Sequence, residues 1–168
     1  MFIIIEGPDG AGKTTLAKQL VRGYPNSKYL HFGCPANEQE ALNYWRVYAK
    51  ALLQADSTKV TILDRSWYSD MVYGPIMRDR LEMVPETVDI LEQLMIKNGG
   101  GLVIYCTADV NILWKRCQER GENYIKTIDK LCDIVDKYEK VLSNHCKLPV
   151  IKYNTSNNWK LRDNYGVD

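Results

Sequence analysis

The first residues whose types and spacing can do chemistry lie near the N-terminus, in the stretch FIIIEGPDGAGKTT. A glycine, four intervening residues and then Gly12, Lys13 and Thr14 fit the pattern G-x-x-x-x-G-K-[ST]. Glycines let backbone amides close around an anion, and a helix starting here adds its positive dipole end. Lys13 is expected to contact the outer phosphates of a nucleoside triphosphate, and the Thr14 hydroxyl to help hold Mg²⁺. The predicted phosphate loop comprises Gly7, Pro8, Asp9, Gly10, Ala11, Gly12, Lys13, Thr14 and Thr15.

The alternative is a glycine-rich turn that fits the pattern by chance, and the flanking sequence argues against it. The apolar run Phe2–Ile5 is short and rich in β-branched residues, which is typical of a strand buried on both faces of a parallel sheet. The segment TLAKQLVRG, which follows the loop, has a helical pattern. A strand, a glycine loop and a helix form the context in which this motif binds nucleoside triphosphates.

A second chemistry-bearing pair, Asp64 and Arg65, occurs in the stretch ILDRSWYSDMVYG. The pair ends a strand-like run, and ligands of parallel sheets bind beyond the carboxyl ends of the strands. An aspartate here can hold a Mg²⁺-bound water or orient an acceptor, while an arginine offers a bidentate contact to phosphate. A local ion pair at the surface is the alternative, and the strand-end position favours the functional interpretation.

The two stretches together resemble known kinase families. DGAGKTT is similar to the phosphate loop of thymidylate kinases, and DRSWYSDMVYG resembles both their D-R motif and the D/E-R-S motif of deoxynucleoside kinases. The resemblance implies that Asp9 lies near the acceptor's 3′-hydroxyl and phosphate and that Arg65 contacts the acceptor phosphate. It also implies a second acceptor arginine on the next helix, for which Arg46 is the best match. A solvated charge on the helix surface is the alternative for Arg46.

The same resemblance predicts an arginine in a lid. Thymidylate kinases whose phosphate loop lacks an arginine supply one from this lid, and the loop here has Gly10 after Asp9 and no arginine. The segment WKRCQERGENY offers Arg116 and Arg120, either of which can stabilise the negative charge that develops during phosphoryl transfer. The alternative for both is an interaction with the helix C-terminal dipole. The choice between the two arginines stays open.

The chain departs from both families at two places. The acidic D-R-x-E continuation of the lid is replaced by Asn123, Tyr124, Ile125 and Lys126. Met71 stands where deoxynucleoside kinases carry an arginine that anchors a base-orienting carboxylate, which argues against a nucleoside kinase of the usual type. The compact chain and mixed motifs are similar to small phage-type relatives of thymidylate kinase, some of which phosphorylate a hydroxymethyluracil base inside DNA.

Aromatic side chains near the acceptor side can stack on a pyrimidine in either case. For at least half of them, packing in the core is the alternative. The candidates are Tyr44, Trp45, Trp67, Tyr68 and Tyr73, with Ser69 beside them in the D-R motif.

Strand-like and helical patterns alternate along the chain and supply the elements that must position these residues. Asn37 and Glu40 resemble a helix N-cap and its partner, Pro85 suits a first helical turn, and Gly99 and Gly121 suit helix ends. The alternation predicts an α/β, three-layer P-loop NTPase fold with a five-stranded parallel sheet flanked by helices. The strand-like runs are residues 2–5, 28–32, 60–63, 101–106 and 149–153.

Two further expectations concern the C-terminal part. Apolar residues at helical spacing predict a core-facing helix with Ile128, Leu131, Val135, Tyr138 and Leu142 on its buried face. The whole chain is expected to be one kinase domain, residues 1–168, with residues 155–168 either a loose tail or docked through Trp159.

Composition limits the remaining possibilities. A chain of 168 residues can bury a core as one domain, and its net charge of +1 does not favour nucleic acid or membrane partners. The five scattered cysteines, with no CxxC pair, are expected to be reduced thiols. We expect a cytoplasmic protein, in the host cytoplasm if it is of phage origin, because no signal peptide or membrane-spanning run is visible. The oligomeric state is left open, with a homodimer as one option.

The sequence therefore predicts an ATP- and Mg²⁺-dependent kinase that phosphorylates a pyrimidine deoxynucleoside monophosphate, thymidylate-like. The main alternative is the same chemistry on the hydroxyl of 5-hydroxymethyluracil in DNA, with Asp9 or Asp64 as the base, because an alcohol must lose a proton. A deoxynucleoside kinase and a nucleotide-dependent switch without an acceptor rank lower. The chain has no N-K-x-D guanine-reading sequence, and a switch would leave the D-R motif without a role.

Overall fold

A computed structural model of the protein describes residues 1–78, 83–121 and 124–156, and it confirms the α/β fold. The strands are β1 (Phe2–Glu6), β2 (Lys28–His31), β3 (Thr61–Asp64), β4 (Gly101–Thr107) and β5 (Val150–Asn154). The helices are α1 (Lys13–Gly23), α2 (Glu38–Leu53), α3 (Trp67–Met77), α4 (Pro85–Lys97), α5 (Val110–Glu119) and α6 (Ile128–His145).

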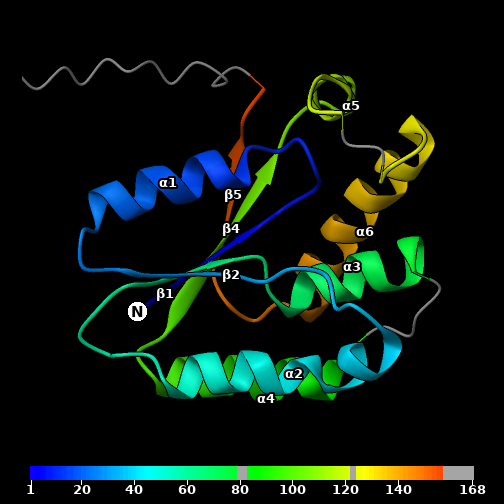
Figure 1. Cartoon of the computed structure of the whole chain (residues 1–168). Coiled ribbons are helices and arrows are strands. Elements are labelled where there is room, and N and C mark those ends of the chain that lie inside the picture. The colour runs from blue at the N-terminus through cyan, green and yellow to red at the C-terminus, as the bar shows by residue number, and fades with distance from the viewer. Residues whose placement is uncertain (79–82, 122–123, 157–168) are drawn as a thin grey trace, which may run out of the picture.

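The five strands form one parallel sheet in the order β2-β3-β1-β4-β5. Every residue of β1 and β3 is buried, because these strands have a neighbour on each side and helices over both faces. Helix α1 lies on one side of the sheet, and α2, α3, α4 and α6 lie on the other (Figure 1). The predicted three layers are therefore present, and the carboxyl ends of β1 and β3 meet at the same edge of the sheet.

Local signals in the sequence begin and end these helices as expected. The Asn37 side chain accepts a hydrogen bond of 2.8 Å from the Glu40 amide, while the Glu40 carboxylate accepts one of 2.6 Å from Ala36. Pro85 occupies the first turn of α4, and Gly99 follows that helix with a φ of 107°. No helix in the described part of the chain is long and apolar enough to cross a membrane.

Helix α6 packs on the core with a face slightly rotated from the predicted one. Leu131, Tyr138 and Leu142 are buried as expected, but Ile134 is also fully buried while Val135 is only partly covered. The difference arises because α6 packs against α3, α4 and α5, so that side chains in adjacent rows of the helix share the burial.

Of the predicted tail, only residues 155 and 156 lie among the described residues. Thr155 is buried, and its amide donates a hydrogen bond of 2.7 Å to the carbonyl of Thr107, so this residue is anchored at the end of β5. Trp159 and the rest of residues 157–168 lie outside the described residues.

The rotation of α6 leads to a direct test. Ile134→Ala should lower the free energy of unfolding by about 2–5 kcal/mol, because it removes a fully buried branched side chain. Val135→Ala, at the next position, should cost less than half as much, since Val135 is only partly buried. Urea denaturation of both variants measures the two values, and equal losses would contradict the packing of α6 described here.

Candidate active site

The loop between β1 and α1 has the geometry of a phosphate cradle. Gly7, Gly10 and Gly12 all have positive φ angles, of 143°, 77° and 80°. A Cβ at Gly7 would lie 2.1 Å from the Cys106 carbonyl oxygen, so only glycine fits at the close approach of the loop to β4. These residues fit a nucleoside triphosphate, because the positive φ angles turn the loop backbone at the N-terminus of α1, where backbone amides can bind phosphate.

Lys13 spans this loop. Its ammonium group donates hydrogen bonds of 2.8 Å each to the carbonyl oxygens of Gly7 and Pro8, and the residue is only 7% exposed. Burial, and then the nearby charge of Arg65, lower the pKa of Lys13 to about 8, against the opposing effect of Asp9 and other carboxylates. Lys13 therefore titrates close to neutral pH in the free protein.

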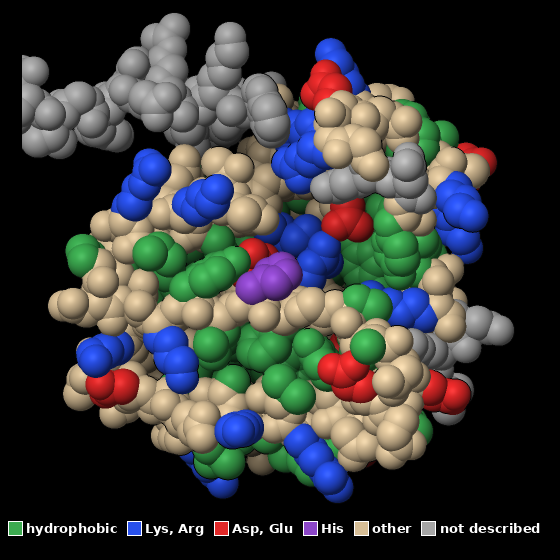
Figure 2. Space-filling model, in the orientation of Figure 1, with side chains coloured by type: hydrophobic (Ala, Val, Ile, Leu, Met, Phe, Trp, Pro, Cys, Tyr) green, Lys and Arg blue, Asp and Glu red, His purple; other side chains and the backbone are tan. Residues whose placement is uncertain are grey.

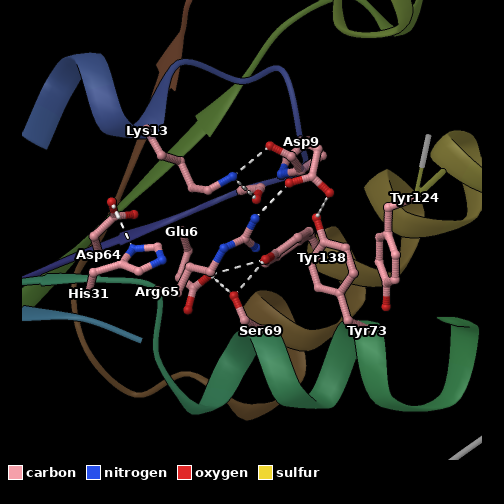
Figure 3. A network of polar contacts seen from close by, with 12 residues as sticks. Glu6, Asp9, Lys13, His31, Asp64, Arg65, Ser69, Tyr73, Tyr124 and Tyr138 are labelled. Atoms are coloured by element: carbon pink, nitrogen blue, oxygen red, sulfur yellow. Dashed lines mark hydrogen bonds and ion pairs between the residues drawn. The ribbon is translucent and has the colours of Figure 1, made fainter. Parts of the chain in front are cut away.

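The second motif faces the loop from the end of β3. Arg65 has a φ of 73°, and this turn aims its guanidinium at the loop, where it contacts the Asp9 carboxylate at 2.6 Å (Figure 3). The Tyr73 hydroxyl donates a bond of 3.0 Å to the other oxygen of Asp9. Burial opposes ionisation of Asp9, but the charges of Lys13 and Arg65 outweigh it, so the pKa of Asp9 is lowered.

Asp64, the other member of the motif, is buried under two residues of the edge strand β2. The Tyr29 hydroxyl donates a hydrogen bond of 2.7 Å to Asp64 Oδ2, and Nδ1 of His31 lies 3.2 Å from the same oxygen. Within the described ranges there is no cluster of three His, Cys, Asp or Glu side chains that could hold a metal ion. A Mg²⁺ ion here would need ligands from Thr14, which is exposed at the start of α1, and from the nucleotide itself.

A cavity of about 330 Å³ opens beside the phosphate loop. Figure 2 shows this face hollowed near its centre, where acidic and basic side chains meet beside a histidine. The walls combine charged groups with aromatic rings, as expected of a small-molecule site. Its lining includes Asp9, Arg65, Ser69, Asp70, Tyr73 and Arg78.

The structure brings together some of the predicted acceptor residues and not others. Asp9, Arg65, Ser69 and Tyr73 all line the cavity. Trp67 and Tyr68 are instead fully buried in the core, where the Tyr68 hydroxyl bonds to Glu92. They point away because Trp67 starts α3, and the cavity face of that helix is formed by residues 69, 70 and 73.

The three predicted residues on α2, Tyr44, Trp45 and Arg46, also lie outside the lining of this cavity. Arg46 is exposed, with its guanidinium 5.4 Å from the centre of the Trp45 ring, and it does not line the cavity. Tyr44 is buried beside Tyr48, with its hydroxyl bonded to the Gly33 carbonyl at 3.1 Å. Position 46 faces outward because positions 44 and 48, one turn apart, face the core.

The two lid arginines are in very different environments. Arg116 is 5% exposed and donates to the Gly10 carbonyl at 3.1 Å and to the hydroxyl and carbonyl of Thr155 at 2.9 Å each. Its guanidinium thus braces the phosphate loop against the end of β5. Arg120 is the exposed C-cap of α5. Of the lid residues, Asn123 lies outside the described residues, whereas Tyr124 and Ile125 line the cavity.

Sequence reasoning missed the far end of the cavity. Arg78 follows α3, lies 3.8 Å from the Asp70 carboxylate and donates a bond of 3.3 Å to the Tyr124 hydroxyl. The Tyr48 hydroxyl donates a bond of 2.7 Å to Asp70. The spacing of Asp70, Gly74 and Arg78 along one helical face was a usable signal, but only if the D-R motif had been read as the start of a helix.

Comparison with known proteins agrees with this geometry. The sequence model of the deoxynucleoside kinase family matches residues 32–165. The chain belongs to the deoxynucleoside kinase family. It is 31% identical over 145 residues to the SPbeta prophage-derived protein YorR of Bacillus subtilis, an alignment that covers 85% of this chain and 82% of YorR. It is 26% identical over 176 residues to a probable thymidylate kinase of Picrophilus torridus, covering 92% and 87% of the two chains.

Solved structures show the same fold. The crystal structure of YorR in complex with phosphorylated GDP superposes with a TM-score of 0.75 at 23% identity, covering 92% of this chain and 86% of that one. Deoxyadenosine kinase from M. mycoides with bound dATP has a TM-score of 0.61 at 18% identity, covering 92% and 91%. The protein is thus a phosphotransferase of the nucleoside and nucleotide kinase type, related to a prophage protein.

Met71, which in the sequence argued against a nucleoside kinase of the usual type, is a fully buried core residue.

The lowered pKa of Lys13 predicts how this kinase binds its donor. Phosphates favour the charged lysine, so a proton must be taken up on binding above pH 8, and donor affinity should fall as the pH rises through about 8. Below that pH Lys13 is already charged and should add no further dependence on pH. Lys13→Arg keeps its charge across this range, so its donor affinity should not show the same decline. Calorimetric titration with an ATP analogue between pH 6.5 and 9.5 measures both curves, and an equal decline in the two proteins would remove Lys13 as the cause.

Proposed function

We propose that the protein transfers the γ-phosphoryl group of ATP to a pyrimidine deoxynucleoside monophosphate. Lys13 and the loop amides hold the donor, Arg65 holds the acceptor phosphate, and Arg120 stabilises the transition state. The observation that carries this proposal is the position of Arg65, which meets the phosphate loop at Asp9. A donor bound in the loop and an acceptor bound by Arg65 would place their phosphates next to one another.

The states of the nearby carboxylates favour a phosphate acceptor over a hydroxyl. A hydroxyl needs a base to take its proton, whereas a phosphate oxygen is already a nucleophile. Asp9 is ion-paired with Arg65 and has a lowered pKa, Asp70 accepts from Tyr48, and Asp64 accepts from Tyr29. Each of these carboxylates is therefore engaged, and a monophosphate makes no demand on any of them.

The far end of the cavity can recognise a base. Asp70 offers a hydrogen-bond acceptor and Arg78 offers donors, so together they complement a base edge with adjacent N–H and carbonyl groups. Tyr73 lies between this pair and Asp9, and its ring packs under the guanidinium of Arg65 at 5.1 Å. Arg78 is thus a second arginine on the acceptor side of the cavity, but as a contact to the base, whereas the sequence resemblance assigned Arg46 to the acceptor phosphate.

Mg²⁺ would neutralise charge on the transferring phosphoryl group when bound. Thr14 is the residue proposed to hold it directly. Asp64 would act through a water molecule, with its carboxylate oriented by Tyr29 and His31.

A deoxynucleoside is the second candidate acceptor, favoured by the family match over residues 32–165. Its hydroxyl would need Asp9 or Asp64 as the base, which requires the acceptor to displace the partners that these carboxylates now have. The DNA alternative has the same requirement.

An acceptor screen with labelled ATP and Mg²⁺ tests the proposal. Deoxynucleosides, their monophosphates, guanine nucleotides and hydroxymethyluracil-containing DNA are offered separately, and the largest kcat/KM is expected with a pyrimidine deoxynucleoside monophosphate.

Arg65→Ala should raise the acceptor KM roughly tenfold or more, because a charge-assisted contact to the phosphate is lost. Arg78→Ala should have a larger effect on the acceptor KM than Arg46→Ala. Phosphorylation of nucleosides or of DNA with no transfer to monophosphates would overturn the proposed acceptor.

The two lid arginines should behave differently. Arg120→Ala should reduce kcat by roughly 100-fold with little change in donor affinity, if its contact forms mainly in the transition state. Arg116→Ala should instead lower the free energy of unfolding by roughly 2–4 kcal/mol, because it removes buried hydrogen bonds to Gly10 and Thr155. Steady-state kinetics and thermal melts of both variants distinguish the roles. A folded Arg120→Ala with normal kcat would exclude Arg120 from catalysis.

A further inference from the structure

Glu6, the last residue of β1, carries a fully buried carboxylate that the proposed chemistry does not use. Its Oε1 accepts a hydrogen bond of 2.7 Å from the Ser66 hydroxyl. Its Oε2 accepts one of 2.7 Å from Ser69 and one of 3.1 Å from the Tyr138 hydroxyl. The carboxylate therefore ties the first turn of α3 and the middle of α6 to the end of the central strand (Figure 3).

The residue just before this anchored turn is Arg65, whose backbone is strained. Its φ of 73° lies in the left-handed region, which non-glycine residues adopt only when their surroundings enforce it. Two neighbouring anchors do so. The Arg65 amide donates to the Ile5 carbonyl at 3.0 Å, and Ser66 is the N-cap of α3 and is held by Glu6. Both anchors come from β1, so this strand holds the backbone on either side of the Arg65 side chain.

Stability alone does not account for a carboxylate at this position. Burial raises the pKa of Glu6 against the effect of its hydrogen bonds, so the surroundings disfavour the charged form. All three side-chain partners are hydroxyls that donate, which is the pattern that suits an acceptor-only group. The charges of Arg65 and Lys13 also act on it favourably. The Glu6 carboxylate therefore fixes the start of α3 directly beside the strained backbone of Arg65.

We propose that Glu6 is a positioning residue, which holds Arg65 in its cavity-facing conformation by fixing Ser66 and Ser69 in the first turn of α3. The carboxylate does not touch the acceptor. Through Ser66 it holds the N-cap, the N-cap sets the backbone of Arg65, and the backbone aims the guanidinium at Asp9. Tyr138 supports the same carboxylate from α6. The consequence for acceptor binding rests on the proposed function of Arg65, but the geometry does not.

The chain offers a matched control for this idea. Glu92 is an equally buried carboxylate whose pKa is also raised by burial, and it accepts hydrogen bonds from Tyr68 and from the Lys147 amide. It lies on α4, does not line the cavity, and contacts α3 at the Tyr68 hydroxyl rather than at the Ser66 N-cap or Ser69. Glu92→Gln therefore reports the cost of changing a buried carboxylate, and Glu6→Gln reports that cost together with any effect on Arg65.

Two measurements on the full chain test the proposal. The first is the nitrogen-15 NMR signal of the Arg65 guanidinium, assigned with Arg65→Lys, which reads its contact with Asp9 without any substrate. This signal should shift and broaden in Glu6→Gln and be unchanged in Glu92→Gln. The second is kinetics with the best acceptor from the screen. Glu6→Gln should raise the acceptor KM by about tenfold, the loss expected for a charge-assisted contact, and should change the ATP KM much less.

Tyr138→Phe is a milder variant in case Glu6→Gln fails to fold. It removes one of the hydroxyl donors to Glu6, so it should move the Arg65 signal in the same direction and raise the acceptor KM by about threefold. Tyr105→Phe is its control, because it deletes a buried hydroxyl from the neighbouring ring, with centroids 5.7 Å apart. If Glu6→Gln and Tyr138→Phe lower the melting temperature but leave the Arg65 signal and the acceptor KM unchanged, Glu6 is only structural and the proposal is wrong. If no acceptor is phosphorylated by the wild-type protein, the NMR comparison alone decides.

Discussion

The ion pair between Asp9 and Arg65 joins the two halves of the site, and most of the local architecture supports it. Asp9 belongs to the phosphate loop after β1, and Arg65 is the first residue after β3. The pair can form because β1 and β3 are parallel neighbours whose register aligns Ile5 with Asp64, so the chains leave both strands at the same edge. The 2.6 Å contact is partly shielded from water, where an interaction of charges is stronger than at the surface.

Each partner of that pair is held from behind by a different part of the chain. The phosphate loop is braced by Arg116 of α5 and by Thr155 at the end of β5, which bond to the carbonyls of Gly10 and Ala11. The start of α3 is held by Glu6 through Ser66 and Ser69. The proposed donor and acceptor sides therefore rest on separate sets of buried hydrogen bonds, which meet at Asp9 through its contacts with Arg65 and Tyr73. Such preorganised polar groups suit electrostatic catalysis of phosphoryl transfer.

Much of the fold could be predicted because its signals are local. The run Phe2–Ile5 marked a buried strand, and Asn37 and Pro85 marked helix starts that the structure confirms. The phosphate loop was equally visible, since Gly7 and Gly12 are required by backbone geometry within a few residues of Lys13. Side chains on helices were harder to assign. Whether Arg46 reaches the cavity depends on which face of α2 packs against the rest of the protein, and no local pattern around Arg46 reveals that.

The sequence by itself determined the parallel α/β fold, the phosphate loop and the D-R pair, because short-range sterics and strand-end position specify them. Only the tertiary structure decided what surrounds them. It buried Trp67 and Tyr68 in the core and made Arg116 a brace of the loop. It also placed Glu6 under the start of α3. These assignments follow from contacts between segments far apart in the chain, such as Glu6 with Tyr138, and the packing of helices on the sheet sets them.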